Sequence, residues 1–365
     1  MKPPHLPPFR ADQVGSLLRP KELAEARRNF KQGKLDAKSL KAIEDRSIRD
    51  AVSKQESIGL ESITDGEFRR DWWHLDFMSQ LDGVTSVVNP GPKFGGTEEQ
   101  PPIPSVTGKV DCSKPIMVGD FSFLEKTTTK TAKFTIPSPA MLHLRGGRSS
   151  ISKEVYPDLD AFWADTSAAW ATAIQHLSDA GCTYLQLDDV SFSYLCDPKI
   201  QDTCRRNGDD PAKLPRTYAN AVTNALKNRP AGMTVTMHTC RGNFKSSWVA
   251  SGGYESVAEA MFSSDVDAFF MEFDSGRAGG FEPLRHLPKG KKVVLGLVTS
   301  KSPVLEEKDF IKKRIEEASK YVPLENLCLS PQCGFSSTHH GNSLTADEQW
   351  RKLERIVEVS REVWR

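Results

Sequence analysis

Residues 159–187, LDAFWADTSAAWATAIQHLSDAGCTYLQL, decide the fold, because an amphipathic helix pattern leads directly into a short apolar run. The helix predicted over Leu159–Ala180 places Phe162, Trp170 and other apolar residues on one face, and Gly181 is well placed to end it. The run Thr183–Leu187 is apolar without a clear alternation, which is typical of strands covered on both faces in parallel sheets. The stretch therefore predicts an α/β protein.

The same unit recurs along the chain. Apolar runs that predict strands cover Asp12–Ser16, Leu60–Thr64, Lys133–Ser138, Thr183–Leu187, Met233–Met237, Ala268–Met271, Val293–Val298 and Leu327–Ser330. Further helices are predicted over Glu306–Tyr321 and after Thr345-Ala346-Asp347-Glu348, which reads as a capping box. Eight strands alternating with helices favour a single (β/α)8 TIM-type barrel over an open doubly wound sheet.

The 365 residues would also allow two domains, but the alternation favours one domain over residues 1–365. Residues 83–130 break the pattern and are rich in proline and glycine, so we expect loops and a hairpin inserted between the second and third strands. Residues 1–9 form a proline-rich N-terminal tail.

Composition excludes several classes of protein. Lys and Arg number 49 against 48 Asp and Glu, a net charge of +1, which argues against a general nucleic-acid or membrane-surface binder. No apolar run approaches the ~18 residues of a membrane span, and the N-terminus has no apolar signal core. We therefore expect a soluble, cytoplasmic protein. Its seven cysteines are an odd, scattered set that is poor evidence for disulfides, which leaves them as core filler, nucleophiles or metal ligands.

The strongest chemical signal is His238-Thr239-Cys240, directly after a predicted strand, because alternate residues of a strand point to the same side. Glu272 and Cys333 follow two later strands. The carboxyl ends of barrel strands meet on one rim, so these four residues are expected to be neighbours. One nitrogen, two sulfurs and one oxygen favour Zn²⁺ over hard cations. The alternative is that both cysteines are packed strand ends and Glu272 is merely solvated.

A second set of polar residues follows the other strands. Asp65-Gly66-Glu67 comes after the second and Asp188-Asp189 after the fourth. Carboxylates on the rim could hold a substrate ammonium group or act as acid or base, although a buried ion pair with Lys or Arg is an equal alternative. Gly15-Ser16 could approach a substrate carboxylate through backbone N–H groups, or be an ordinary turn.

Together these motifs resemble the catalytic barrel of the cobalamin-independent methionine synthases, as a short stand-alone homologue, from about Ala11 to Trp364. The most specific matches are His238-Thr239-Cys240, the Glu272 segment and Pro331-Gln332-Cys333-Gly334. The resemblance implies a catalytic barrel whose zinc ligands are His238, Cys240, Glu272 and Cys333. It also implies that Ser16 faces the homocysteine carboxylate and that the catalytic residues Glu67 and Asp188 face its amino group.

The donor side departs from the family pattern. Thr299 and Lys301 stand where the long synthases carry an Asp and a His that relay a proton to the departing folate. The tryptophan that stacks on the pterin is missing from Ser138–Arg145. The resemblance therefore implies a zinc-dependent methyltransferase of methionine-synthase type that acts on homocysteine or a related thiol, with an open methyl donor and no nucleic-acid or membrane partner.

Two alternatives stay open. The first is a zinc-dependent thiol alkyltransferase acting on another electrophile, similar to the epoxyalkane:coenzyme M transferases, whose sulfonate would suit Lys301 or Arg145. The second is a non-catalytic zinc-binding homologue. Other polar and aromatic residues have open roles: Trp72 and Trp73 could close over a substrate or simply pack. His339 and His340 could join the site as acid, base or spare ligand, or form a pair in a surface loop, and no role is predicted for His143.

Overall fold

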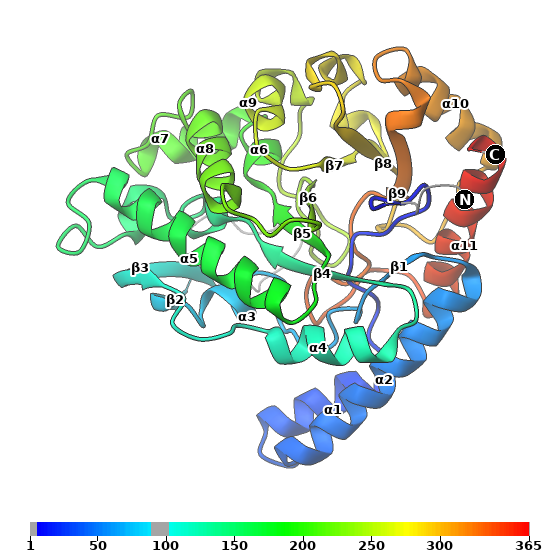
Figure 1. The fold of residues 1–365 in the computed structure, drawn as a ribbon, viewed down its shortest axis with the longest axis horizontal. Coiled ribbons are helices and arrows are strands. Elements are labelled where there is room, and N and C mark those ends of the chain that lie inside the picture. Colours follow the sequence, from blue (N-terminus) through cyan, green and yellow to red (C-terminus); the bar gives the residue numbers. More distant parts are fainter. Residues whose placement is uncertain (1–5, 89–101, 365) are drawn as a thin grey trace.

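The computed structural model describes residues 6–88 and 102–364, and its centre is a curled parallel sheet of seven strands (Figure 1). Neighbouring strands pair in parallel in the order β1-β4-β5-β6-β7-β8-β9. Their bounds are Ser62–Ile63 (β1), Thr131–Pro137 (β4), Tyr184–Asp189 (β5), Thr234–Thr239 (β6), Ala268–Glu272 (β7), Lys292–Val298 (β8) and Leu327–Pro331 (β9). The predicted α/β class is confirmed, and the curled sheet is consistent with a TIM-type barrel.

The predicted strand Asp12–Ser16 is wrong as a continuous strand. Among the described residues, the segment and its preceding residue make isolated parallel bridges, from Ala11 to Leu329 of β9 and from Ser16 to Gly66 just after β1. It therefore lies between the two edges of the sheet without forming a ladder to either. Its Gly15 has a φ of 147°, and a Cβ there would lie 2.9 Å from Cγ2 of Thr135. This close approach inside the curled sheet favours glycine at a point where the chain leaves regular strand geometry.

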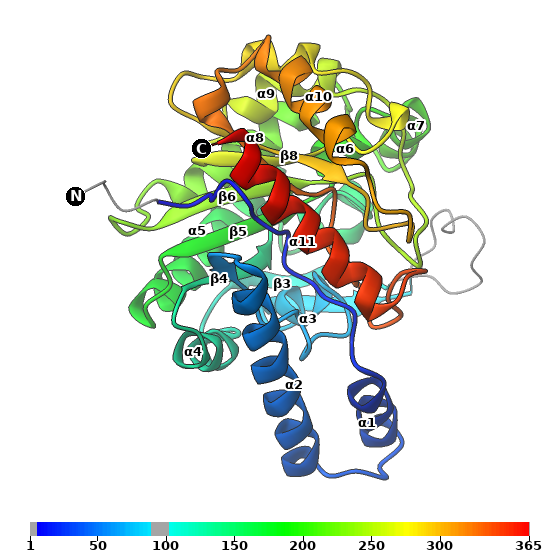
Figure 2. The ribbon, with the colours of Figure 1, turned by 90° about the vertical axis from the view of Figure 1, so that its right-hand side faces the viewer.

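Helices cover the outside of the sheet (Figures 1 and 2). The longer ones are α1 (Lys21–Lys31), α2 (Ala37–Ile58), α4 (Val118–Thr127), α5 (Leu159–Asp179), α7 (Pro198–Arg206), α8 (Leu214–Leu226), α10 (Lys308–Ser319) and α11 (Ala346–Val363). Short helices are α3 (Leu75–Met78), α6 (Ser191–Tyr194) and α9 (Ala258–Phe262). In Figure 2, α1 and part of α2 project from the rest of the molecule. Among the described residues, no helix combines the length and apolarity that crossing a membrane requires.

The helix predicted from the deciding stretch is confirmed as α5. Its buried face includes Phe162, Trp170 and Ile174, and Trp170 Nε1 donates a hydrogen bond to the Pro137 carbonyl at the end of β4 (2.7 Å). The predicted capping box is also present, since Thr345 Oγ1 accepts from Glu348 N (3.3 Å) while the Glu348 carboxylate accepts from Thr345 N (2.7 Å).

Between β1 and β4 the chain forms α3, an antiparallel pair and α4. The pair joins β2 (Asp82–Val87) to β3 (Ile103–Asp111), and β3 contacts α5. The expected loops and hairpin of residues 83–130 therefore include regular elements. The proline- and glycine-rich residues 89–101 of that segment, and residues 1–5 of the N-terminal tail, lie outside the described residues.

Candidate active site

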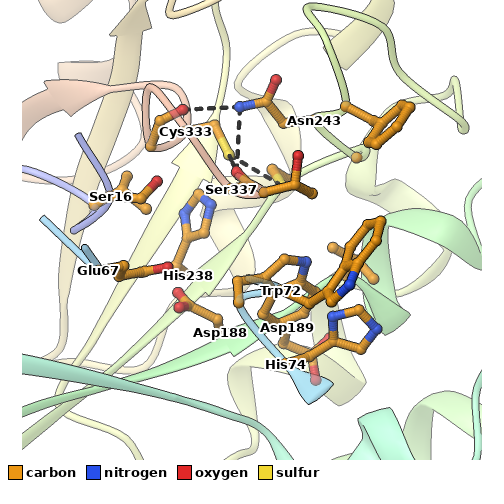
Figure 3. Close-up of a pocket in the computed structure, with 18 of the residues that line it drawn as sticks. Ser16, Glu67, Trp72, His74, Asp188, Asp189, His238, Asn243, Cys333 and Ser337 are labelled. Atoms are coloured by element: carbon orange, nitrogen blue, oxygen red, sulfur yellow. Dashed lines mark hydrogen bonds between the residues drawn. The ribbon is translucent and has the colours of Figure 1, made fainter. Parts of the chain in front are cut away.

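The candidate site is a cavity at the carboxyl ends of the strands (Figure 3). Loops that follow β1, β4, β5, β6 and β9 line it, together with the Val14–Ser16 segment. This is the rim of the sheet where parallel barrels place their functional groups. Its lining includes most of the predicted residues, among them Ser16, Glu67, Asp188, His238, Cys240 and Cys333.

Three of the four predicted metal ligands meet in this cavity. One ligand atom each of His238, Cys240 and Cys333 lies within 4.8 Å of the other two, and the two sulfurs are 3.6 Å apart. All three side chains are buried. Neither ring nitrogen of His238 has a hydrogen-bond partner among the described residues. A buried imidazole without a partner is unfavourable unless something else binds it, so this donor set fits a metal ion.

The pKa values of the two thiols are shifted in opposite directions. The hydrogen bond shared with Cys240, and then the His238 ring, hold the pKa of Cys333 well below its usual value. The same shared bond, followed by burial, raises the pKa of Cys240. One thiolate therefore forms readily before any metal is bound, and a cation at this position would favour the second.

Glu272 lies outside this group of three. It is the last residue of β7 and is fully buried, but its carboxylate already accepts hydrogen bonds from the Arg241 backbone N–H (2.8 Å) and from Arg277 Nη2. Arg277 also reaches Asp274 Oδ1 (3.3 Å). Glu272 as a fourth ligand thus stays a prediction.

Glu67 and Asp188 present buried carboxylates to the same cavity. Glu67 adopts a φ of 59°, which is uncommon for a non-glycine residue and common at functional sites. Its Oε1 accepts from Thr135 Oγ1 (3.0 Å), whereas Oε2 is buried without a partner among the described residues. Asp188 Oδ1 accepts from Gln186 Nε2 (2.7 Å). Figure 3 shows the His238 ring between these carboxylates and Cys333.

Burial is the largest cause of the pKa shift of both carboxylates. It raises the pKa of Glu67 to about 7, with Arg70 opposing the shift and Asp188 adding to it. It raises the pKa of Asp188 to about 6, with His238 opposing. Both groups would ionise more easily beside a cation, so the pair is suited to an ammonium ligand.

Ser16 is held against the loop after β9. Its Oγ accepts from Ser336 N (3.3 Å), and a Cβ at Gly334 would lie 2.0 Å from that oxygen. A side chain at Gly334 would therefore force the Ser16 hydroxyl to move from this position.

Other predicted residues have structural roles. Asp65 Oδ1 accepts from Glu67 N (2.9 Å), and Asp189 Oδ1 accepts from Ser191 N (2.5 Å) at the start of α6. His143 is buried away from the cavity, where Nδ1 contacts Tyr218 Oη (2.9 Å) and Nε2 contacts Asp209 Oδ1 (3.2 Å).

The aromatic residues after Glu67 are part of the site. Trp72 and Trp73 both line the cavity. Trp72 also stacks on Phe244, with ring centroids 6.3 Å apart, and packs against His339 and His340. Neither histidine lines the cavity. The packing and the substrate-facing interpretations of these tryptophans are therefore compatible.

Sequence reasoning missed His74, Tyr194 and Asn243, which also line the cavity. Asn243 Nδ2 donates to the Gly334 carbonyl (2.8 Å) and to Ser337 Oγ (3.2 Å), as Figure 3 shows. His74 and Asn243 lie in loops that follow β1 and β6, and Tyr194 is the last residue of α6, which follows β5. That position on the rim was the signal that could have identified them.

Comparisons with known proteins agree with this geometry. Residues 9–361 match the family model described as the catalytic domain of cobalamin-independent synthases. The Bacillus subtilis protein YxjG, itself uncharacterised, is 46% identical over 364 residues, covering 98% of this chain and 96% of its own. A Listeria monocytogenes structure assigned as a vitamin-B12 independent methionine synthase is 41% identical, with a TM-score of 0.80 and 98% of each chain covered.

A longer relative is the 5-methyltetrahydropteroyltriglutamate–homocysteine methyltransferase of Lactococcus lactis, which is 23% identical over 363 residues. The alignment covers 98% of this chain but only 44% of that enzyme, so the chain spans less than half the length of this methyltransferase. The family match over nearly the whole chain, with the predicted motifs gathered on one rim, shows that the chain belongs to the cobalamin-independent methionine synthase family.

Proposed function

We propose that this protein is a zinc-dependent methyltransferase that transfers a methyl group to the thiol of homocysteine or a related amino-acid thiol. The observation that carries the proposal is the buried group of His238, Cys240 and Cys333, in one cavity with two buried carboxylates. The longer relatives are named for methyl transfer to homocysteine, which agrees with the proposal.

Zinc suits the donor set, because two thiolates and an imidazole are soft and borderline ligands. His238, Cys240 and Cys333 would hold it, and Glu272 would join them if its carboxylate turned from Arg277. When bound, zinc lowers the pKa of a substrate thiol so that a nucleophilic thiolate is present near neutral pH.

The protein's own residues would bind and orient the thiol. The Gly15-Ser16 segment offers polar groups to the substrate carboxylate, and Glu67 and Asp188 offer negative charge to its ammonium group. Holding both ends of an amino acid would direct its sulfur toward the cysteines. The two acids favour an amino-acid thiol over a sulfonate thiol, which has no ammonium group.

The residues that differ from the family pattern leave the identity of the methyl donor open. Thr299 and Lys301 replace the proton relay, and the Pro139–Leu142 turn with its flanking residues holds no tryptophan. We further propose that residues 1–365 act as one (β/α)8 catalytic barrel, with residues 12–16 in the place of the first strand and residues 83–130 as an insertion. Thiol ligands of this kind favour a reducing compartment such as the cytoplasm.

X-ray absorption at the zinc edge, with and without homocysteine, tests the proposal. We expect a stoichiometric site and one additional Zn–S contact when homocysteine is added. In parallel, methyl transfer is assayed with 5-methyltetrahydropteroyltriglutamate, methylcobalamin and a methyl sulfonium, and an epoxide tests the alkyltransferase alternative. An unchanged spectrum with no alkylated thiol from any donor would contradict the proposal and favour a non-catalytic zinc protein.

A further inference from the structure

Ser337 places a hydroxyl group beside the sulfur of one candidate metal ligand. Its Oγ lies 3.6 Å from Cys333 Sγ, in a hydrogen bond to the sulfur. The backbone of Ser337 is fixed at the same point, because its carbonyl accepts a hydrogen bond from Trp73 N (3.2 Å) in the loop after β1. Ser337 therefore forms part of the cavity wall next to Cys333, and both residues line the cavity.

Asn243 determines the direction of this hydrogen bond. Its side chain contacts the Gly334 carbonyl (2.8 Å) and Ser337 Oγ (3.2 Å) through the same nitrogen atom. A carbonyl oxygen only accepts and an amide nitrogen only donates, so Asn243 donates one hydrogen bond to Gly334 and the other to Ser337. The Ser337 oxygen accepts from Asn243, and its own proton is left for the Cys333 sulfur, as the dashed lines in Figure 3 follow.

The orientation of the Asn243 amide is set by its surroundings. Asn243 is 8% exposed, and its Oδ1 is buried without a partner among the described residues. Rotating the amide by half a turn would bring Oδ1 against the Gly334 carbonyl, where two acceptors would face each other. The orientation with Nδ2 toward Gly334 and Ser337 is therefore the favourable one, although it leaves Oδ1 unpaired.

The two candidate thiolate ligands differ in these contacts. Among the described residues no hydroxyl bonds to the sulfur of Cys240, whereas the backbone carbonyl of Cys240 accepts from Ser193 Oγ. Cys333 thus has a hydroxyl donor on its sulfur that Cys240 lacks. A hydrogen bond to a coordinated thiolate withdraws electron density from the sulfur and holds it in one orientation, and loss of such an outer contact typically costs about 10–100-fold in metal affinity or activity.

We propose that Ser337, oriented by Asn243, is a positioning residue of the metal centre that donates a hydrogen bond to the Cys333 sulfur and makes Cys333 the weaker of the two thiolate donors. The inference rests on the proposed function only through its metal site, since it concerns how Cys333 is held and not which thiol or methyl donor reacts. A weaker donor at Cys333 would leave more of the ion's charge to act on a substrate sulfur.

Cobalt(II) is the probe, because it can replace zinc in a tetrahedral thiolate site and its thiolate-to-metal absorption band reports the electron density on the sulfurs. Ser337→Ala should shift this band to longer wavelength, since a thiolate that has lost a hydrogen bond gives up an electron more easily. It should also weaken zinc binding about tenfold, measured by competition with a chromophoric chelator. Ser337→Thr keeps the hydroxyl and should restore both properties.

Variants of Asn243 test whether the contacts act in series. Asn243→Leu removes the bond that orients Ser337 and should shift the band in the same direction by a smaller amount. In the variant that carries both Ser337→Ala and Asn243→Leu, the band should lie where Ser337→Ala alone places it, because Asn243 acts through the hydroxyl. Ser193→Ala is the matched control, since it removes a buried hydroxyl from the carbonyl of Cys240 rather than from a sulfur, and it should leave the band unmoved.

Each outcome decides the inference. A cobalt spectrum and a zinc affinity of Ser337→Ala equal to those of the wild type would overturn it. Equal changes in Ser337→Ala and Ser337→Thr would also overturn it, because they would mean that the serine only packs against Cys333. Additive band shifts in the double variant would remove Asn243 from the series.

Failure of the proposed function looks different. In that case no donor methylates a thiol, while the band shift that depends on Ser337 persists. Wild-type protein that binds neither cobalt nor zinc would refute both proposals together.

Discussion

Substitution of Cys240 and Cys333 tests whether the two residues bind a metal ion or are simply packed cysteines. We expect Cys240→Ser and Cys333→Ser each to lose stoichiometric zinc and methyl transfer together, because a serine hydroxyl does not ionise readily enough to replace a thiolate ligand. Elemental analysis of the purified variants checks the metal, and a thiol-alkylation assay checks the activity.

The matched control is Cys182→Ser. Cys182 is also buried, and its sulfur contacts the Tyr184 carbonyl (3.6 Å), a contact that a hydroxyl can make. It should retain about one zinc per chain. Full zinc in Cys333→Ser would remove that residue from the ligand set.

The carboxylate pair predicts how homocysteine binding depends on pH. The pKa of Glu67 is raised to about 7 and that of Asp188 to about 6, so both are ionised at pH 8 and Glu67 is largely protonated at pH 6. A protonated carboxyl does not attract an ammonium group. We therefore expect the Kd for homocysteine to rise about tenfold from pH 8 to pH 6, measured by calorimetry on the zinc-loaded protein.

Glu67→Gln provides the internal comparison for this pH dependence. It should weaken homocysteine binding about tenfold at pH 8 and flatten the profile between pH 6 and 8, because its amide does not titrate. A variant profile as steep as that of the wild type would place the titrating group elsewhere, for instance on the substrate sulfur.

The loop after β4 is the element that we expect to govern the donor side. His143 in this loop bridges Tyr218 of α8 and Asp209, and Asp209 also accepts from Arg148 N (3.2 Å). Asp209→Ala should lower the free energy of unfolding by about 1–3 kcal/mol, because it removes the acceptor of the Arg148 N–H and the carboxylate in contact with buried His143 Nε2. Urea denaturation measures this loss.

A control for that variant lies on the exposed face of α7. Asp202→Ala removes a carboxylate from a solvated pair with Arg205 and should change stability by less than about 1 kcal/mol. Asp209→Ala should leave the zinc content unchanged, because Asp209 is not part of the group of His238, Cys240 and Cys333.

Elements with long periodic patterns were predictable from sequence, and those shaped by distant contacts were not. The apolar face of α5 and the capping box of α11 depend on neighbouring residues only, and both are present. Asp12–Ser16 has a strand-like sequence, yet within the described residues the bridges at its two ends are single, from Ala11 to β9 and from Ser16 to the turn after β1. Its place is set by two sheet edges that come from opposite ends of the chain, which no local pattern encodes.

The residues of the candidate site also fall into those that the sequence predicts and those that only the structure reveals. His238, Cys240 and Cys333 could be predicted because strand ends converge in a parallel sheet, whatever the detailed packing. For His74 and Tyr194 the sequence offers only their position after β1 and β5, and the folded structure is needed to show that these side chains are buried without hydrogen-bond partners among the described residues. The contacts of Glu272 also required the structure, since its hydrogen bonds come from Arg241 in the loop after β6 and from Arg277 in the loop after β7.

The metal centre should also stabilise the whole molecule, because its ligands join parts of the chain that are far apart. Cys240 and Cys333 are separated by 93 positions and lie after strands β6 and β9, which are not adjacent in the sheet. Zinc that binds only the folded chain stabilises it by about 4 kcal/mol when free zinc is about a thousand times its Kd. Removing zinc with a chelator should therefore lower the Tm by about 5–15 °C in differential scanning calorimetry.

Cys333→Ser should already melt near the lower temperature and should not respond to the chelator. A chelator-induced shift of equal size in that variant would mean that the stabilising metal binds somewhere else.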